Sequence, residues 1–192
     1  MRHVRPPPPA SALARLAAAE REGGQGRVNA DKLYLVGFMG AGKTTIGRAL
    51  SRRIGWRFED IDERIEGRVR RSVASIFAQH GEPHFRQLER EVLSELLPQR
   101  QVIIATGGGT FAEPDNRALM LADGAVAWLD LPLAQVFDRV PADGRRPLAA
   151  DRVAMEQLYA RRRLAYAEAH VRIDASRSSA ETVEQILNWI GF

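Results

Sequence analysis

The chain has 192 residues, 45% of them hydrophobic and 27% charged, which is the ordinary balance of a globular protein with one domain and a substantial core. It contains no cysteine, which excludes disulfides, thiolate metal sites and a cysteine nucleophile, and no apolar run is long enough to span a bilayer. Of the formal net charge of +4, a net +3 belongs to residues 1–30, which carry five arginines and two glutamates, so we do not expect a nucleic-acid-binding core.

Residues 1–30 are expected to form a flexible N-terminal extension, and residues 31–192 the folded domain. Pro6–Pro9 favour extended polyproline geometry, and Gly23–Gly24 favour a linker. A signal peptide is disfavoured because Arg15 interrupts the apolar stretch, whereas the Arg-rich start leaves an organelle transit peptide as an alternative.

The first motif of the domain follows a short apolar run, Lys32–Val36, which we expect to be a strand. Gly37–Thr44 then matches the phosphate-binding pattern G-x-x-x-x-G-K-[ST] in full, and Thr44–Ile54 has the apolar spacing of a helix. Glycines let consecutive backbone N–H groups face phosphate oxygens, and the helix start adds a partial positive charge. Lys43 would reach the β- and γ-phosphates and the Thr44 hydroxyl would bind Mg²⁺, so the stretch predicts a nucleoside-triphosphate site rather than a plain turn.

Short β-like runs and longer helical patterns alternate over the rest of the chain, which is typical of parallel βαβ units. We therefore predict an α/β fold of the P-loop kinase type, a three-layer α/β/α sandwich with a five-stranded parallel sheet. Residues from about 141 to 151 combine glycine, prolines and charges and are expected to form a lid. The further strands are expected at Trp56–Glu59, Gln101–Ala105, Ala125–Leu129 and Val171–Ile173, and the further helices at Asp62–Glu66 (with Gly67 as its stop), Val73–Ala78, His84–Leu97, Asn116–Ala122, Leu133–Val140, Val153–Ala169 and Ser179–Trp189.

Acidic side chains follow two of the predicted strands, and ligands of open parallel sheets bind beyond such strand ends. Asp60 and Asp62 are two residues apart, so in an extended segment both carboxylates would project the same way, one toward a metal and one toward a substrate hydroxyl. The alternative is that Asp62 caps the following helix. Asp130, at the end of an apolar run, is a second candidate for the metal.

Three glycines and several arginines are further candidates. Gly107–Gly109 follow the third strand and would allow close approach of the backbone to a ligand, although a flexible turn is the alternative. Arg86, with Glu89 three residues later to orient it, and Arg146 and Arg162 could bind a carboxylate or a transferring phosphate, unless they are ordinary surface charges.

Together these motifs resemble the shikimate kinase family, a P-loop group related to nucleoside-monophosphate kinases, from about Leu33 to the C-terminus. The resemblance rests on GFMGAGKTT, FEDIDERIE, GEPHFRQLE, TGGG, RRPL and the late Arg162…Tyr166 pair, in the family's order and spacing. It implies phosphorylation of the 3-hydroxyl of shikimate by ATP, with Mg²⁺, in the route to chorismate and the aromatic amino acids. We expect a cytoplasmic enzyme that is a monomer, with shikimate and ATP as its ligands and without nucleic-acid or membrane partners.

The resemblance also implies roles for individual residues. Asp62, Lys43 and Arg146 would be catalytic, and Thr44 would bind Mg²⁺ with Asp60 contributing through water, which favours Asp60 over Asp130. Phe77 and Phe85 would form the apolar wall of the substrate pocket. The ATP site would comprise Gly40, Ala41, Gly42, Lys43, Thr44, Thr45, Arg139 and Arg146, and the shikimate site Asp62, Arg86, Gly108 and Arg162.

The chain departs from the family pattern R-x-P-[LV]-Y, because Arg162–Tyr166 lacks the proline. Arg161 and Arg163 therefore remain alternatives to Arg162 as the ligand of the substrate carboxylate. Ala180 also stands where the family commonly has a proline. Two other functions are open: a kinase for another small hydroxylated acid such as gluconate, and a nucleotide-binding regulator whose basic N-terminus contacts nucleic acid or a protein.

Overall fold

The computed structural model describes residues 30–139 and 152–192. The predicted N-terminal extension, the predicted lid at about 141–151 and the candidate Arg146 lie outside these ranges, so these three predictions remain predictions.

Five strands form one sheet in the order β2-β3-β1-β4-β5, and every neighbouring pair is parallel. The predicted five-stranded parallel sheet is therefore confirmed, with strand ends that differ by at most a residue or so from the sequence-based ranges. The strands are β1 (Lys32–Val36), β2 (Arg57–Asp60), β3 (Val102–Ala105), β4 (Ala125–Asp130) and β5 (Val171–Asp174).

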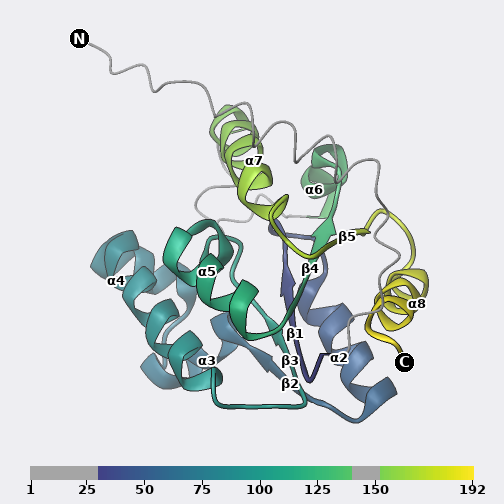
Figure 1. Ribbon diagram of the computed structural model, residues 1–192. Helices are drawn as coiled ribbons and strands as arrows, with labels where there is room; N and C mark the ends of the chain where they lie inside the picture. Colours follow the sequence, from purple (N-terminus) through teal and green to yellow (C-terminus); the bar gives the residue numbers. More distant parts are fainter. Residues whose placement is uncertain (1–29, 140–151) are drawn as a thin grey trace.

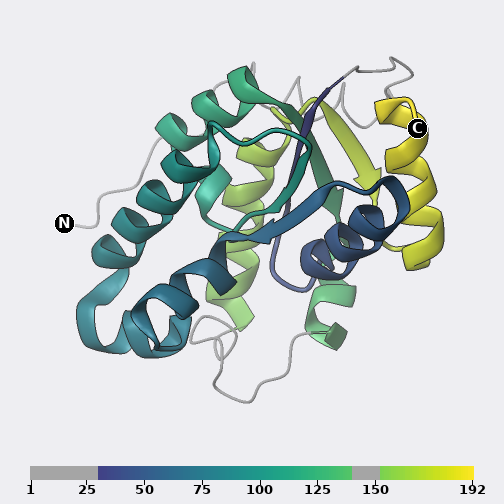
Figure 2. The ribbon, with the colours of Figure 1, turned by 90° about the horizontal axis from the view of Figure 1, so that it is seen from below.

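Helices cover both faces of this sheet, which confirms the three-layer architecture. Figures 1 and 2 show α2 and α8 together on one side of the sheet and α4 and α5 on the other. The helices are α2 (Lys43–Ile54), α3 (Ile61–Val69), α4 (Val73–Leu96), α5 (Pro114–Asp123), α6 (Leu133–Arg139), α7 (Arg152–Tyr166) and α8 (Ser179–Ile190), with a short 3-10 helix η1 (Thr110–Ala112).

Several helix boundaries differ from the predictions: α5 begins earlier than predicted, at Pro114, and α7 ends at Tyr166 rather than at Ala169. Gly67 does not end α3, which continues to Val69; a Cβ there would meet nothing within 4 Å, so this glycine costs the helix only its intrinsic propensity. The two helices predicted at Val73–Ala78 and His84–Leu97 both form, and they follow one another in α4 across a break at Gly81, which has φ 77° and ψ 172°. The left-handed φ at Gly81 redirects the chain, and Pro83 starts the second segment, where its missing N–H costs little.

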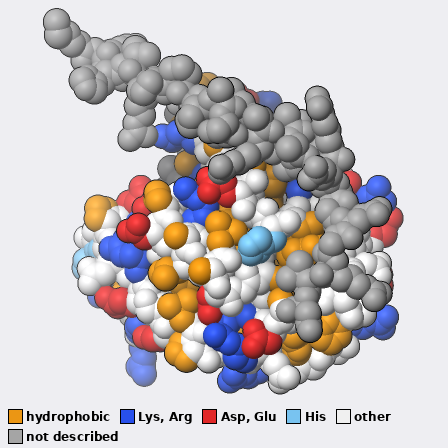
Figure 3. Space-filling model, viewed as in Figure 1, with side chains coloured by type: hydrophobic (Ala, Val, Ile, Leu, Met, Phe, Trp, Pro, Cys, Tyr) orange, Lys and Arg blue, Asp and Glu red, His pale blue; other side chains and the backbone are white. Residues whose placement is uncertain are grey.

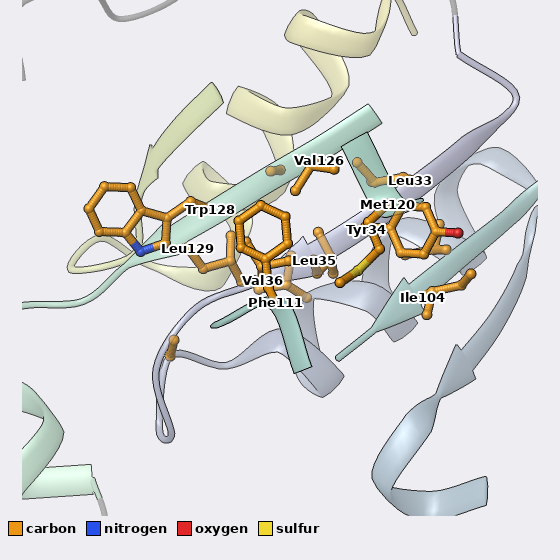
Figure 4. Close-up of a cluster of buried hydrophobic side chains, with 14 of the residues drawn as sticks. Leu33, Tyr34, Leu35, Val36, Ile104, Phe111, Met120, Val126, Trp128 and Leu129 are labelled. Carbon is orange, nitrogen blue, oxygen red and sulfur yellow. The ribbon is translucent and has the colours of Figure 1, made fainter. Parts of the chain in front are cut away.

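The hydrophobic core lies between the sheet and its helices. The strands β1, β3 and β4 are buried along their whole length, as expected for parallel strands covered on both faces. Figure 4 shows side chains of β1 and β4 packed with Phe111 of η1 and Met120 of α5. This packing holds the strands in place, so the residues that follow each strand have defined positions at the C-terminal edge of the sheet.

A polar cluster lies at the N-terminal end of β1. The fully buried ammonium of Lys32 donates to Asp123 Oδ2 at 2.5 Å and to the Leu97 carbonyl at 2.7 Å, and the Tyr34 hydroxyl donates to the same Asp123 oxygen at 2.5 Å. Each buried polar group in this cluster thus has a partner, which is the condition for tolerating a charge in a core.

The surface mixes both signs of charge. In Figure 3 basic and acidic side chains are interspersed on the face that is drawn, without a broad patch of one sign among the described residues. Within residues 30–139 and 152–192, no helix has the length and apolarity needed to cross a membrane.

Candidate active site

The phosphate-binding motif forms a loop between β1 and α2. Gly40 and Gly42 adopt left-handed φ values of 77° and 87°, and a Cβ at Gly37 would lie 2.6 Å from the Leu129 carbonyl oxygen, so these positions need glycine. The Lys43 ammonium donates to the Gly37 and Phe38 carbonyls, each at 2.9 Å. Within the described chain no side chain caps α2, so its first N–H groups face the loop as donors for an anion.

Asp60 connects this loop to the end of β2. Its Oδ2 accepts a 2.7 Å hydrogen bond from the Thr44 hydroxyl, and its Oδ1 accepts from the backbone N–H groups of Asp62 and Glu63. Asp60 is therefore the N-cap of α3, and the alternative prediction that Asp62 caps this helix is wrong. Asp62 lies in the first turn of α3 rather than in an extended segment, so the expectation of two parallel carboxylates is also wrong.

The Thr44–Asp60 pair fits a small hard cation. One hydroxyl and one carboxylate oxygen meet beside the phosphate loop, and Mg²⁺ takes oxygen ligands, usually from one or two side chains together with phosphates and waters.

Asp130, the other candidate for the metal, is engaged elsewhere. Its Oδ2 accepts from Arg163 at 3.2 Å and from Arg172 at 2.8 Å. Burial raises the pKa of Asp130, and the two guanidinium groups oppose that shift. This geometry favours Asp60 over Asp130 as the carboxylate that would contribute to binding the metal.

The three glycines after β3 lie against charged side chains from three helices. A Cβ on Gly107 would lie 2.8 Å from Asp62 Oδ1, and one on Gly109 would lie within 2.5 Å of three atoms of the Arg86 guanidinium. A Cβ on Gly108 would lie 3.1 Å from Arg162 Nη1 and 3.7 Å from the Gly37 oxygen, to which Lys43 also donates. Asp62, Arg86 and Arg162 therefore converge on one backbone segment next to the phosphate loop.

Arg86 is held on both sides by acids. Its guanidinium donates to Glu89, as the i+3 spacing predicted, and also to Glu82 Oε1 at 2.7 Å. Glu89 is fully buried and accepts a second hydrogen bond, from the Thr110 hydroxyl at 2.5 Å. Burial opposes the charge of Arg86, but the two glutamates outweigh it and raise its pKa. Glu82 and Thr110 were not predicted, although the i−4 spacing of Glu82 is a usable signal.

The three consecutive arginines of α7 have different surroundings. Arg161 is exposed, and Arg163 pairs with Asp130 and packs on the Trp128 ring. Arg162 is only 8% exposed, lies beside Gly108 and over the Phe38 ring, and its pKa is lowered, first by burial and further by nearby Arg86. The structure thus brings Arg162, and not its neighbours, to the glycine segment.

The remaining candidates lie around this centre. Arg139 ends α6 and donates to the Ala175 carbonyl at 3.5 Å, at the start of the loop after β5. The rings of Phe77 and Phe85 lie 4.8 Å apart on α4, just before Arg86. Thr45 is exposed in the first turn of α2.

Known proteins resemble the chain over most of its length. The family model described as "Shikimate kinase" matches residues 39–191. A shikimate kinase of Persephonella marina is 39% identical over 82% of this chain and 98% of its own, and one of Synechococcus elongatus is 40% identical over 85% and 88%. A solved structure, "Shikimate kinase from Acinetobacter baumannii in complex with shikimate", is 35% identical over 83% of this chain and 92% of its own, with a TM-score of 0.78. A gluconokinase from Sinorhizobium meliloti, 15% identical with a TM-score of 0.52, shares the fold alone.

Proposed function

This chain belongs to the shikimate kinase family, and we propose that it transfers the γ-phosphoryl group of ATP to the 3-hydroxyl of shikimate, giving shikimate 3-phosphate and ADP on the route to chorismate and the aromatic amino acids. The observation that carries the proposal is the convergence of Asp62, Arg86 and Arg162 on residues 107–109, beside the phosphate loop. A small carboxylated polyol needs cations for its carboxylate and an acceptor for its hydroxyls, and these three side chains supply both.

The ATP end of the site would use the loop between β1 and α2. Lys43 would exchange its two carbonyl acceptors for β- and γ-phosphate oxygens, and the N–H groups of residues 40–45 would hold the same phosphates. Arg139, which contacts the loop after β5, would lie near adenine, as the family resemblance implies. Arg146, outside the described residues, is proposed to close over the phosphates.

The shikimate end would use the glycine segment. Arg86 and Arg162 would bind the carboxylate, with the Gly108 backbone between them and Phe77 and Phe85 against the ring.

Asp62 would accept the proton of the 3-hydroxyl as its oxygen bonds to the γ-phosphorus, while the bond from the γ-phosphorus to the bridging oxygen breaks and ADP leaves. Such a transfer depends on positioning and charge stabilisation more than on covalent catalysis, which suits a site made of backbone N–H groups and of arginines held by neighbouring side chains.

Thr44 and Asp60 would hold Mg²⁺, which when bound neutralises charge on the β- and γ-phosphates. We also propose that the protein acts as a monomer in the cytoplasm.

The test is an ADP-release assay on the full chain with Mg²⁺ and ATP, comparing shikimate, gluconate and nucleoside monophosphates. The proposal expects turnover with shikimate far above the others and a product whose mass corresponds to one added phosphoryl group. A higher kcat/KM for gluconate or for a nucleotide would overturn the substrate assignment. Negligible turnover with every acceptor, together with salt-sensitive binding to nucleic acid, would instead support the regulator.

A further inference from the structure

A buried tyrosine of α7 contacts the glycine segment and has no role in the site as described so far. Tyr166 is 1% exposed, its ring packs 6.0 Å from that of Trp128, and its hydroxyl donates to the Gly108 carbonyl at 2.5 Å. Burial raises the pKa of Tyr166, so the phenol keeps its proton and acts as a hydrogen-bond donor at any physiological pH.

The same helix reaches Gly108 twice. Arg162 lies one helical turn before Tyr166, and its Nη1 would be 3.1 Å from a Cβ on Gly108. Two buried side chains of α7 therefore reach Gly108, and they also contact each other, because Arg162 forms a side-chain hydrogen bond with the Tyr166 hydroxyl.

Backbone hydrogen bonds hold the start of the glycine segment to β1 and close a turn around Gly108 and Gly109. The backbone N–H of Thr106 donates to the Leu35 carbonyl at 3.1 Å, and the backbone N–H of Thr110 donates to the Gly107 carbonyl at 3.2 Å. Between them Gly108 has no side chain to pack and has the largest conformational entropy to lose. The Tyr166 hydrogen bond acts on this middle residue.

The Gly108 carbonyl shares a rigid peptide plane with the Gly109 N–H. This plane lies between the two arginines, because Arg162 approaches Gly108 and the Arg86 guanidinium approaches Gly109. A rotation of the plane would change the backbone surface that both guanidinium groups lie against.

We propose that Tyr166 is a positioning residue for the carboxylate end of the substrate: its hydroxyl fixes the Gly108–Gly109 peptide plane between Arg86 and Arg162. The inference rests on the proposed function and deepens it. Tyr166 does not contact the substrate; it acts through the Gly108 carbonyl and through its contact with Arg162, so its loss weakens shikimate binding and leaves ATP binding intact.

The test compares Tyr166→Phe with Tyr159→Phe. Each variant removes one hydroxyl from α7 and keeps the ring; Tyr159 is also buried, but its hydroxyl donates to the Leu131 carbonyl at 3.0 Å, away from the glycine segment. Shikimate binding is measured by calorimetry, KM for ATP by ADP release, and amide hydrogen exchange over residues 106–110 by mass spectrometry, with a thermal melt as the folding control.

Tyr166→Phe is expected to raise the shikimate Kd by about three- to tenfold, the effect of one lost hydrogen bond, and to speed exchange over 106–110, with KM for ATP unchanged. Tyr159→Phe is expected to keep the wild-type shikimate Kd. The inference would be overturned if Tyr166→Phe had the wild-type shikimate Kd, or if the shikimate Kd rose equally in Tyr166→Phe and Tyr159→Phe. The proposed function would stand in either case. If Tyr166→Phe proves too unstable for calorimetry, wild-type exchange decides: the Thr110 amide, which donates to the Gly107 carbonyl across the turn, must be protected without shikimate, and rapid exchange there overturns the inference. Wild-type protein that neither binds nor phosphorylates shikimate would refute the proposed function and this inference with it.

Discussion

Adding a single methyl group at Gly109 is a sharp test of the site. The backbone there is ordinary, with φ −101°, so alanine introduces no strain of its own. Its Cβ would nevertheless lie 2.4 Å from both terminal nitrogens of Arg86, whereas ordinary contact begins at 3.4 Å. The guanidinium must retreat by about 1 Å, and a misplacement of that size in an active site costs about 100-fold in rate.

Two responses to the methyl group are possible, and their costs differ. If Arg86 swings away, it gives up charge-assisted hydrogen bonds to Glu82 and Glu89 worth about 1.5–3 kcal/mol each. If the backbone shifts instead, the overpacking costs about 1–3 kcal/mol. Either response displaces the arginine from the glycine segment, so we expect Gly109→Ala to lower kcat/KM for shikimate by about 100-fold, or about 2.7 kcal/mol, with KM for ATP preserved.

The matched control is Gly67→Ala. A Cβ at Gly67 meets nothing within 4 Å, and this glycine lies inside α3, so alanine should raise the free energy of unfolding by up to about 1 kcal/mol and leave the kinetics unchanged. The assay is ADP release with shikimate varied at saturating ATP, beside urea melts of both variants. Wild-type kcat/KM in Gly109→Ala would refute the packing argument, and so would an equal loss in both variants.

Three further predictions follow from contacts in and outside the site. Asp62→Asn should lower kcat by at least about 100-fold while KM for ATP stays the same; near-normal turnover would remove Asp62 from proton transfer. Arg162→Met should raise KM for shikimate well above the value for Arg161→Met, because only Arg162 is buried beside Gly108; the reverse order would make Arg161 the ligand. His170 is exposed as a residue, but its Nδ1 accepts from the Val126 N–H at 3.0 Å and partial desolvation of the ring lowers its pKa from 6.5. Below about pH 6.5 the unfolded state therefore binds the proton more readily, and stability falls as the pH falls. Urea melts at about pH 7.5 and 5.5 should show a smaller difference for His170→Asn than for wild type, and an unchanged difference would contradict this account.

The sheet and the phosphate loop were predictable because their signals are local. The apolar runs of β1, β3 and β4 are buried on both faces and therefore appear as uninterrupted hydrophobic stretches in the sequence. The break at Gly81 was predicted as a gap between two helices, since the glycine and Pro83 end one helical period and start another. Gly67 gave the same local signal, but tertiary packing of α3 overrides it.

The choice among the three arginines could also have been made from the sequence. The buried residues of α7 recur at helical spacing and are Met155, Tyr159, Arg162 and Tyr166. Arg162 therefore lies on the inward face of the helix, and Arg161 does not. In contrast, no local pattern shows that Gly109 lies against Arg86 or that the Tyr166 hydroxyl reaches Gly108. Both contacts join segments more than twenty residues apart and depend on how α4 and α7 pack against η1, which follows the glycine segment.

The balance of charge around the glycine segment explains why an anionic ring suits this site. Glu82 and Glu89 compensate Arg86, while Arg162 is buried beside it and has its pKa lowered by burial and by that neighbouring cation. Asp130 cannot compensate Arg162, because its carboxylate is bound to Arg163 and Arg172. Glu82 and Glu89 offset the two positive charges only in part. A carboxylate placed between Arg86 and Arg162 would therefore lower the cost of holding two partly desolvated cations together, whereas a neutral polyol would leave that cost in place. The carboxylate of shikimate would therefore contribute to binding through charge as well as through hydrogen bonds, and its hydroxyls would then be held toward Asp62 and the phosphate loop.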